Sequence, residues 1–303
     1  MLTVDCHVDL PWIWTKYCPF DLRERQKDST VDFPRMKEGG LDCFVAALYL
    51  SDGIQDDVGP EKSFDIIDWQ IRELKAQKGC QVVDSSVAAI EAHNLGLVPI
   101  FLGLEGGRLA NLRRLKSLRE QGVRYLTLTH NKNTDWADSA TDQPKNRGLT
   151  MYGRSMIREA EGLGILVDVS HASDLTCVDV VNMAEEPVLA THSGCRKIWD
   201  HPRNLPDTLI KSIAKTKGVI HVPFARKFVG PTSKWIAAHI DHLAQLLGNV
   251  DHIGIGSDLD GAVLCEGAED ASKWKTAINL SDRGYKDEQI AAILGGNTLR
   301  MFQ

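Results

Sequence analysis

Eight short apolar segments alternate with longer amphipathic segments along almost the whole of this 303-residue chain. Most of the short segments are almost wholly apolar, which is typical of parallel strands that are covered on both faces. Eightfold alternation of strand and helix in a chain of this length predicts a (β/α)8, or TIM, barrel of the α/β class, with a doubly wound open sheet as the alternative. The predicted strands are residues 2–7, 41–50, 97–103, 123–130, 165–171, 187–192, 218–223 and 252–258.

The segments between these strands carry apolar residues at three- and four-residue spacing, as expected of helices that pack on a sheet. Gly122, Gly164 and Gly218 lie where turns from helix to strand are expected. No linker or low-complexity segment interrupts the pattern, so we expect a single barrel domain over residues 1–303. The predicted helices are residues 63–78, 109–121, 152–162, 175–184, 207–216 and 233–247, followed by a closing helical segment in 286–303.

Charge and cysteine content exclude several classes of protein. The formal net charge is −6, and a mildly acidic chain has no electrostatic attraction to phosphate backbones, so we expect no nucleic-acid partner. The seven cysteines are odd in number and none forms a CxxC pair, which argues against a disulfide framework and favours reduced thiols. The first residues, MLTVDCHVDLPW, lack a signal-peptide pattern, and no apolar run is long enough for a bilayer. We therefore expect a cytoplasmic protein without a membrane anchor.

Residue types that bind metals gather at the ends of six of the eight predicted strands. In a TIM barrel the carboxyl ends of the strands carry the reactive residues, so these side chains are expected to converge. Imidazole nitrogen and carboxylate oxygen are the donors that zinc and similar cations take. The strand-end residues are His7 and Asp9 after the first strand, Glu105 after the third, His130 after the fourth, His171 after the fifth, His192 after the sixth and Asp258 after the eighth.

The spacing of these residues predicts a site for two metal ions. His7 and Asp9 are two residues apart on an extended chain, so their side chains share one face and can bind one ion. His171 and His192 follow neighbouring strands and would hold a second ion, and a carboxylate such as Glu105 would bridge the two. We interpret the remaining histidines as structural, with two of them on a solvated helix face; they are His93, His201, His221 and His252, and the helical pair His239 and His242.

Several motifs resemble the membrane dipeptidase (renal dipeptidase) family, peptidase family M19 of the amidohydrolase superfamily. In chain order they are DCHVDLPW, GLEGG, RYLTLTHNKNTDWADS, DVSHAS, THSG, HPRNLPD, GIGSDLDG and GGNTLRMF. The resemblance runs from Asp5 to Phe302, nearly the whole chain. The segment HVPFARKFVGPTSKW matches the family less well, so the shape of the substrate pocket is the feature that the resemblance constrains least.

The resemblance implies a binuclear zinc site and a metallo-dipeptidase activity. It implies that dipeptides, L-Xaa-L-Xaa and also L-Xaa-D-Xaa, are hydrolysed through a metal-bridging hydroxide. The residues it implies are His7 and Asp9 for one zinc, His171 and His192 for the other, Glu105 as the bridge, His130 for the substrate and its oxyanion, Arg203 for the terminal carboxylate and Asp258 for proton transfer.

Other functions remain open at this point. A non-peptidase amidohydrolase could use the same two metals to open an amide, a lactone or a β-lactam, because a barrel fold does not fix the reaction. A non-catalytic binding protein is a more remote alternative, because every expected ligand is present. Members of the family are often homodimers, so the resemblance makes a homodimer one expected assembly. The sequence specifies neither the preferred side chains of the substrate nor the pathway.

Overall fold

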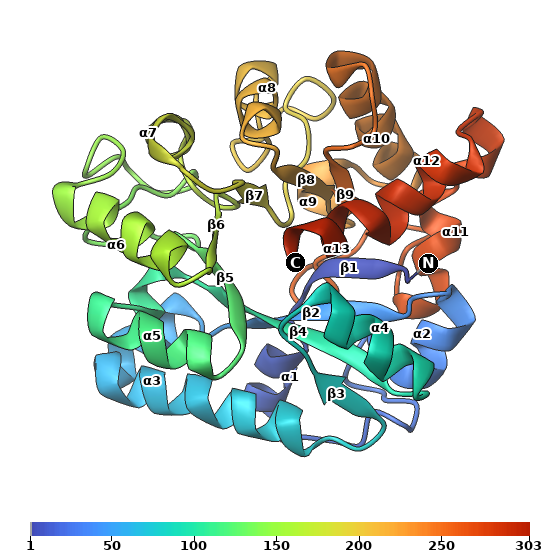
Figure 1. Cartoon of the computed structure of the whole chain (residues 1–303), viewed down its shortest axis with the longest axis horizontal. Helices are drawn as coiled ribbons and strands as arrows, with labels where there is room; N and C mark the ends of the chain where they lie inside the picture. Colours follow the sequence, from blue (N-terminus) through green and yellow to red (C-terminus); the bar gives the residue numbers. More distant parts are fainter. Residues whose placement is uncertain (1) are drawn as a thin grey trace.

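In the computed structural model, which describes residues 2–303, eight parallel strands close into a barrel (Figure 1). The neighbour order is β2-β1-β9-β8-β7-β6-β5-β4, and β2 pairs with β4 from Phe44↔Ile100 to Leu48↔Leu104, which closes the ring. The predicted TIM barrel is confirmed, and the alternative of an open sheet is wrong. The barrel strands are β1 (Val4–Val8), β2 (Cys43–Leu48), β4 (Val98–Glu105), β5 (Val123–Thr127), β6 (Leu166–Asp168), β7 (Leu189–Ala190), β8 (Val219–Val222) and β9 (Ile253–Ile255).

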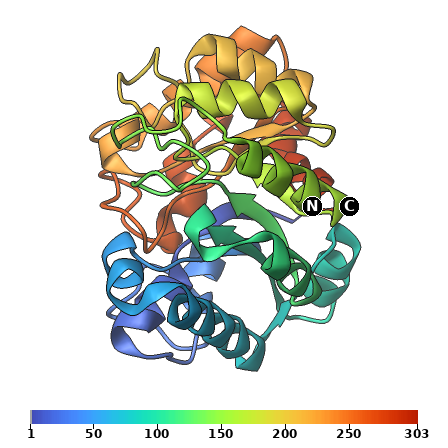
Figure 2. The same cartoon turned by 90° about the vertical axis from the view of Figure 1, so that its left-hand side faces the viewer.

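Helices surround the barrel strands (Figures 1 and 2). Their apolar residues join the outward side chains of the strands in one continuous buried core. The helices are α1 (Leu10–Tyr17), α2 (Phe33–Gly39), α3 (Asp52–Ala76), α4 (Ser86–Asn94), α5 (Leu112–Glu120), α6 (Met151–Gly162), α7 (Asp174–Met183), α8 (Asp207–Lys215), α9 (Arg226–Val229), α10 (Lys234–Leu247), α11 (Trp274–Ile278), α12 (Asp287–Ala291) and α13 (Asn297–Met301).

Each predicted strand overlaps one barrel strand, but some elements were not predicted. The short strand β3 (Cys80–Val82) pairs only with β4 among the strands and is absent from the predictions. The helices α1, α2, α4, α9 and α11 are absent from them as well. The predicted helix 63–78 is wrong in its start, because α3 begins at Asp52. Gly59, at φ 79°, and Pro60 kink this helix, and the kink breaks the apolar periodicity before residue 63.

Several loops that lead from the sheet into a helix end in a side-chain cap. Ser51 caps α3, Thr150 caps α6 and Ser173 caps α7, each by accepting a hydrogen bond from a backbone N–H in the first turn. Such caps satisfy N–H groups that a helix leaves unpaired, and each typically contributes about 1 kcal/mol. The caps fix where these helices begin and therefore the course of the loops at the carboxyl end of the barrel.

The amino-terminal end of the barrel is closed by apolar side chains. Phe302, which follows α13, stacks on Phe101 of β4 with ring centroids 4.5 Å apart. Leu2, Val4 and other inward residues of the strands pack in the same cluster. Because this end is filled, only the opposite, carboxyl end of the barrel is left for a polar site.

One glycine in the barrel interior makes room for an aromatic side chain. Gly103 of β4 lies in register with Tyr125 of β5. A Cβ atom on residue 103 would overlap the Tyr125 ring. The glycine therefore allows the fully buried Tyr125 side chain to pass beneath the carboxyl end of the barrel.

The prediction that His239 lies on a solvated helix face is wrong, because His239 of α10 is fully buried. Its Nδ1 accepts a hydrogen bond from Cys195 N–H at 2.8 Å, so its proton lies on Nε2 and is donated to the Val229 carbonyl at 3.2 Å. The ring therefore ties α10 to the loops after β7 and β8.

All seven cysteines are free thiols. Within residues 2–303, no helix has both the length and the apolar character needed to cross a bilayer.

Candidate active site

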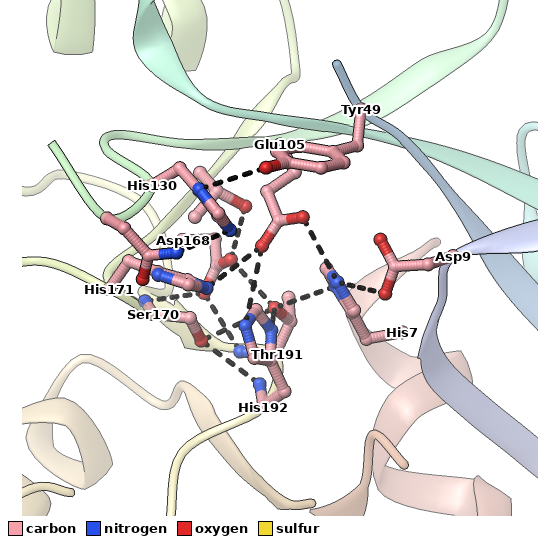
Figure 3. Close-up of polar contacts among 12 residues, drawn as sticks. His7, Asp9, Tyr49, Glu105, His130, Asp168, Ser170, His171, Thr191 and His192 are labelled. Atoms are coloured by element: carbon pink, nitrogen blue, oxygen red, sulfur yellow. Dashed lines mark hydrogen bonds and ion pairs between the residues drawn. The ribbon is translucent and has the colours of Figure 1, made fainter. Parts of the chain in front are cut away.

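The predicted strand-end residues meet at the carboxyl end of the barrel, and Figure 3 labels all of them except Asp258. His7 lies in β1, Asp9 is the first residue after β1, and Glu105 is the last residue of β4. The side chains of all five predicted metal ligands are buried, with at most 6% of each residue exposed. The other predicted residues lie in loops: His130 after β5, His171 after β6, His192 and Arg203 after β7, and Asp258 after β9.

The Glu105 carboxylate lies between the two groups of predicted ligands. Its Oε2 faces the group formed by His7 and Asp9 and lies 3.6 Å from His7 Nε2. Its Oε1 is 3.1 Å from His171 Nε2 and 3.4 Å from His192 Nε2. Each carboxylate oxygen therefore faces one group, which is the arrangement expected of a bridging ligand.

Asp258 lies close to His7 and Asp9, on the same side of the site. Donor atoms of these three residues lie within 4.8 Å of one another. Asp258 has φ 66°, a left-handed conformation that is uncommon outside glycine and that is often found at functional sites. Gly261 is required here, because a Cβ atom on it would overlap the carboxylates of both Asp9 and Asp258.

The donor set fits a pair of metal ions. Two donors that lie ~2.1 Å from one tetrahedral zinc are ~3.4 Å apart, and the His7 Nε2 to Asp9 Oδ2 distance is 3.5 Å. Among residues 2–303, His7 Nε2, Asp9 Oδ2 and His192 Nε2 are buried without a hydrogen-bond partner. Buried polar atoms are rarely left without a partner, so these orphaned atoms point to a ligand such as a cation.

The electrostatics of the cluster also favour a cation. Burial, and then the positive charge of neighbouring groups, lower the pKa of His171 and His192 well below the usual value, so both rings are neutral and able to bind a metal. Burial acts in the same direction on His7, but the carboxylates of Glu105 and Asp9 outweigh it and raise the pKa of His7. A bound cation would take the place of this proton.

His130 lies beside the second group of ligands. Its ring centroid is 4.5 Å from that of His171. Its Nδ1 lies 3.2 Å from the Tyr49 hydroxyl and 3.3 Å from Asp52 Oδ2, so two side chains from the end of β2 and the start of α3 orient the ring. These contacts leave Nε2 as the atom available to a substrate, apart from a 3.4 Å approach by the Asn131 amide.

Arg203 is a buried cation whose donors are free. Only 3% of the residue is exposed, and within the described part of the chain none of its three guanidinium nitrogens has a hydrogen-bond partner. Burial lowers the pKa of Arg203 to about 10, partly offset by the charges of Asp258 and Glu105, so the group stays charged at neutral pH. An unpaired buried guanidinium is costly, and an anionic group such as a carboxylate would satisfy it.

Asp258 has the environment of a proton carrier. Burial, and then the Asp9 carboxylate, raise the pKa of Asp258 well above the usual value of an aspartate. A carboxyl group with a raised pKa can hold a proton near neutral pH and release it. The structure thus brings the five predicted metal ligands close to His130 and Asp258.

Other residues of the site were not predicted. Tyr49 and Asp52 follow a strand end, so their position alone could have indicated them. Asp168, Thr191 and Tyr125 lie behind the predicted ligands and are buried. Hydroxyl residues within apolar strands carry no sequence signal that separates them from the core.

The sequence and the fold resemble known proteins. The family model described as membrane dipeptidase (peptidase family M19) matches residues 1–303. Dipeptidase verJ of Clonostachys rogersoniana is 35% identical over 248 residues, which are 79% of this chain and 63% of that protein. An uncharacterized dipeptidase of Schizosaccharomyces pombe is 36% identical over 197 residues, 62% of this chain and 48% of that protein. The matched regions thus span less than two thirds of either relative.

Solved structures share the fold over the full chain. A dipeptidase of metallopeptidase family M19 superposes with a TM-score of 0.89 at 23% identity, covering 100% of this chain and 98% of the other. A metallopeptidase from Rhodobacter sphaeroides, liganded with a phosphinate mimic of the dipeptide L-Ala-D-Ala, has a TM-score of 0.86 at 24% identity with the same coverage. At these identities the likeness concerns the fold, whereas the match of the family model over all 303 residues concerns the sequence. The chain belongs to the membrane dipeptidase family, peptidase family M19.

Proposed function

We propose that this protein is a dipeptidase that binds two zinc ions and hydrolyses the peptide bond of free dipeptides, L-Xaa-L-Xaa and L-Xaa-D-Xaa. The observation that carries the proposal is the position of Glu105, with one carboxylate oxygen toward His7 and the other toward His171 and His192. Following the family resemblance, the proposed ligands are His7 and Asp9 for one ion, His171 and His192 for the other, and Glu105 for both. When bound, paired zinc ions supply a nucleophilic water at neutral pH and polarise the scissile carbonyl.

Arg203 selects the substrate by its charge. Its three guanidinium nitrogens are buried and unpaired within the described residues, so the carboxylate of a dipeptide would satisfy them and fix the orientation of the substrate. This preference for a carboxylate supports a dipeptidase over an amidohydrolase that acts on uncharged amides or lactones. The dipeptide mimic bound by the metallopeptidase from Rhodobacter sphaeroides supports the same substrate class.

His130 and Asp258 act on the two atoms of the peptide bond. When the Tyr49 hydroxyl donates to Nδ1 of His130, the ring proton lies on Nε2, which would donate a hydrogen bond to the carbonyl oxygen as negative charge develops. Asp258 would hold the proton released by the attacking water and deliver it to the nitrogen of the leaving amino acid. Its raised pKa supports this role.

Hydrolysis of a dipeptide panel tests the proposal. The zinc-loaded protein is given L,L- and L,D-dipeptides together with their N-acetylated and C-amidated forms, and amino-acid release is measured. We expect cleavage of the free dipeptides and loss of cleavage when the terminal carboxylate is amidated. A protein that holds two zinc ions but cleaves none of these dipeptides would contradict the proposal and point to another amide or lactone substrate. A homodimer remains a prediction of the family resemblance.

A further inference from the structure

Two buried hydroxyl groups, those of Thr191 and Tyr125, lie behind the histidines of the proposed metal site, and Figure 3 shows Thr191 beside His192. His7 and His192 each turn Nε2 toward Glu105, at 3.6 and 3.4 Å. Their Nδ1 atoms face away from Glu105 and meet hydroxyls. Thr191 Oγ1 is 2.9 Å from His192 Nδ1 and 3.4 Å from His7 Nδ1, and the Tyr125 hydroxyl is 3.0 Å from His7 Nδ1.

Asp168 determines the direction of the hydrogen bond from Thr191. Its Oδ1 accepts from the backbone N–H groups of Ser170 at 3.0 Å and Thr191 at 2.8 Å. Its Oδ2 accepts from the hydroxyls of Thr127 at 2.6 Å and Thr191 at 2.7 Å. Four donors occupy the lone pairs of a carboxylate, which can only accept. Thr191 therefore donates its single proton to Asp168 Oδ2, because this charged acceptor at 2.7 Å is closer than either histidine Nδ1, at 2.9 and 3.4 Å, or Ser170 Oγ, at 3.4 Å.

The oxygen of each hydroxyl then has a lone pair that can accept a hydrogen bond from a histidine Nδ1. Because the Thr191 hydroxyl has no second proton, His192 Nδ1 must be the donor in their 2.9 Å hydrogen bond. The Tyr125 hydroxyl lies 3.0 Å from His7 Nδ1 and can donate its own proton to the Cys6 carbonyl at 3.4 Å, which leaves its oxygen able to accept from His7 Nδ1. A proton on Nδ1 of a neutral imidazole leaves the lone pair on Nε2, the atom that faces Glu105.

We propose that Thr191, anchored by Asp168, and Tyr125 are positioning residues that fix the Nδ1–H tautomers of His192 and His7 and so direct both Nε2 lone pairs to the zinc ions. The inference rests on the proposed function, in which these two histidines bind different ions. Thr191 is the shared element, because its one hydroxyl contacts a histidine from each group of ligands.

Loss of such an outer partner weakens metal binding without removing a ligand. Replacing groups that orient metal-bound histidines typically costs 10–100-fold in metal affinity. Thr191→Val keeps the branched shape of the side chain but removes the hydroxyl, so His192 Nδ1 loses its acceptor and Asp168 loses one donor. We expect the zinc held by His171 and His192 to bind roughly 10–100-fold more weakly in this variant.

Thr127→Val is the matched control. Thr127 is also fully buried and donates to the same oxygen of Asp168, but its hydroxyl makes no hydrogen bond to a histidine. If the hydroxyls served only to support Asp168, the two valine variants would lose zinc affinity equally. Thr191→Ser restores a hydroxyl at the same position and is expected to recover most of the affinity.

Zinc affinity is measured by competition with a chelator in the wild type, T191V, T127V and T191S, with the melting temperature of each metal-free protein as a check on folding. A large loss in T191V, with T127V and T191S close to wild type, supports the proposal. Wild-type affinity in T191V, or equal losses in T191V and T127V, would overturn it. Wild-type protein that binds two zinc ions but cleaves no dipeptide would contradict the proposed function and leave this comparison unchanged.

Long-range ¹H–¹⁵N NMR of histidine in the zinc-loaded wild type reads the tautomers directly. We expect His7 and His192 to carry their protons on Nδ1 and to bind metal through Nε2. A proton on Nε2 of His192 would overturn the inference whatever the affinities are. Tyr125→Phe, which removes only the hydroxyl behind His7, is expected to weaken the zinc held by His7 and Asp9 in preference to the other zinc.

Discussion

The guanidinium carbon of Arg203 lies 5.1 Å from the centre of the Phe228 ring. Phe228 belongs to α9, in the segment that matches the family motifs least, and its ring also packs against His201 with ring centroids 5.0 Å apart. Arg203 is thus supported on one face by an aromatic ring while its nitrogens stay available to a substrate. Phe228, from a segment that matches the family motifs poorly, therefore supports Arg203, which belongs to the motif HPRNLPD that matches them well.

Replacement of Phe228 should weaken substrate binding more than it slows the reaction. Phe228→Leu removes the cation–π contact, which contributes about 0.5–1 kcal/mol at exposed sites and about 2 kcal/mol when desolvated, so KM should rise roughly 2- to 30-fold while kcat changes little. Phe228→Tyr keeps the aromatic face and should stay near wild type. Steady-state kinetics with one free dipeptide gives both constants. An unchanged KM in the leucine variant would remove Phe228 from the support of Arg203.

Removal of Arg203 should abolish the preference for a free carboxylate. Arg203→Ala loses charge-assisted hydrogen bonds of roughly 3 kcal/mol in total, so kcat/KM for free dipeptides should fall about 100-fold. Any residual hydrolysis of a C-amidated dipeptide should be little affected. Arg154→Ala is the control, because Arg154 pairs with Asp179 on α6 and α7. Equal losses on free and amidated substrates would contradict the carboxylate contact.

Asp258→Asn should separate metal binding from turnover. The amide keeps the size of the side chain but cannot carry a proton between water and the leaving amine, so kcat should fall by roughly 100-fold or more. Asp258 is not one of the five proposed ligands, so the variant should retain two zinc ions by elemental analysis. Normal turnover would remove Asp258 from the mechanism.

Protonation of His239 should destabilise the fold in mild acid. Burial lowers the pKa of His239 to about 4, whereas an unfolded histidine titrates near 6.5. Between these values the unfolded chain binds more protons, so the free energy of unfolding falls as the pH drops from 6.5 toward 4, by up to about 3 kcal/mol from this residue. Above pH 6.5 its contribution is constant.

A paired comparison isolates this residue. Metal-free wild type and His239→Asn are unfolded by urea at several pH values. Asparagine keeps an acceptor near Cys195 N–H but does not titrate, so the variant should be less stable at pH 7 and should lose less stability on acidification. His221, whose pKa burial also lowers to about 4, remains in both proteins and cancels in the difference. Parallel pH curves for the two proteins would contradict the prediction.

The barrel strands could be predicted because the pattern that specifies them is local. Each is a short apolar segment bounded by turn residues, and parallel strands that are covered on both faces look alike wherever they occur. Closure of the sheet could not be derived in this way, because the pairing of β1 with β9 joins Asp5 to Ile255, 250 residues apart, and leaves no local signal. The helix α1 was missed for a different reason: it starts immediately after Asp9, without a side-chain cap or a turn.

The site was predictable to the extent that its chemistry depends on distinctive residue types. His7, Glu105 and His171 are conspicuous at strand ends, because barrel topology brings such ends together. Thr191 and Tyr125 were not predictable, since a hydroxyl within an apolar strand becomes meaningful only when its hydrogen-bond partners are known. The spacing between donors, such as 3.1 Å from Glu105 to His171, is a property of the folded barrel alone.

We propose that the converging histidines and carboxylates form a hydrolytic site for two zinc ions. The most direct test adds zinc in measured equivalents to metal-free protein and follows the rate of L-Ala-L-Ala hydrolysis. The rate should be negligible without metal and should rise to a plateau at two equivalents of zinc per chain. Full activity in the rigorously metal-free protein, or no dipeptide hydrolysis once two zinc ions are bound, would contradict the account.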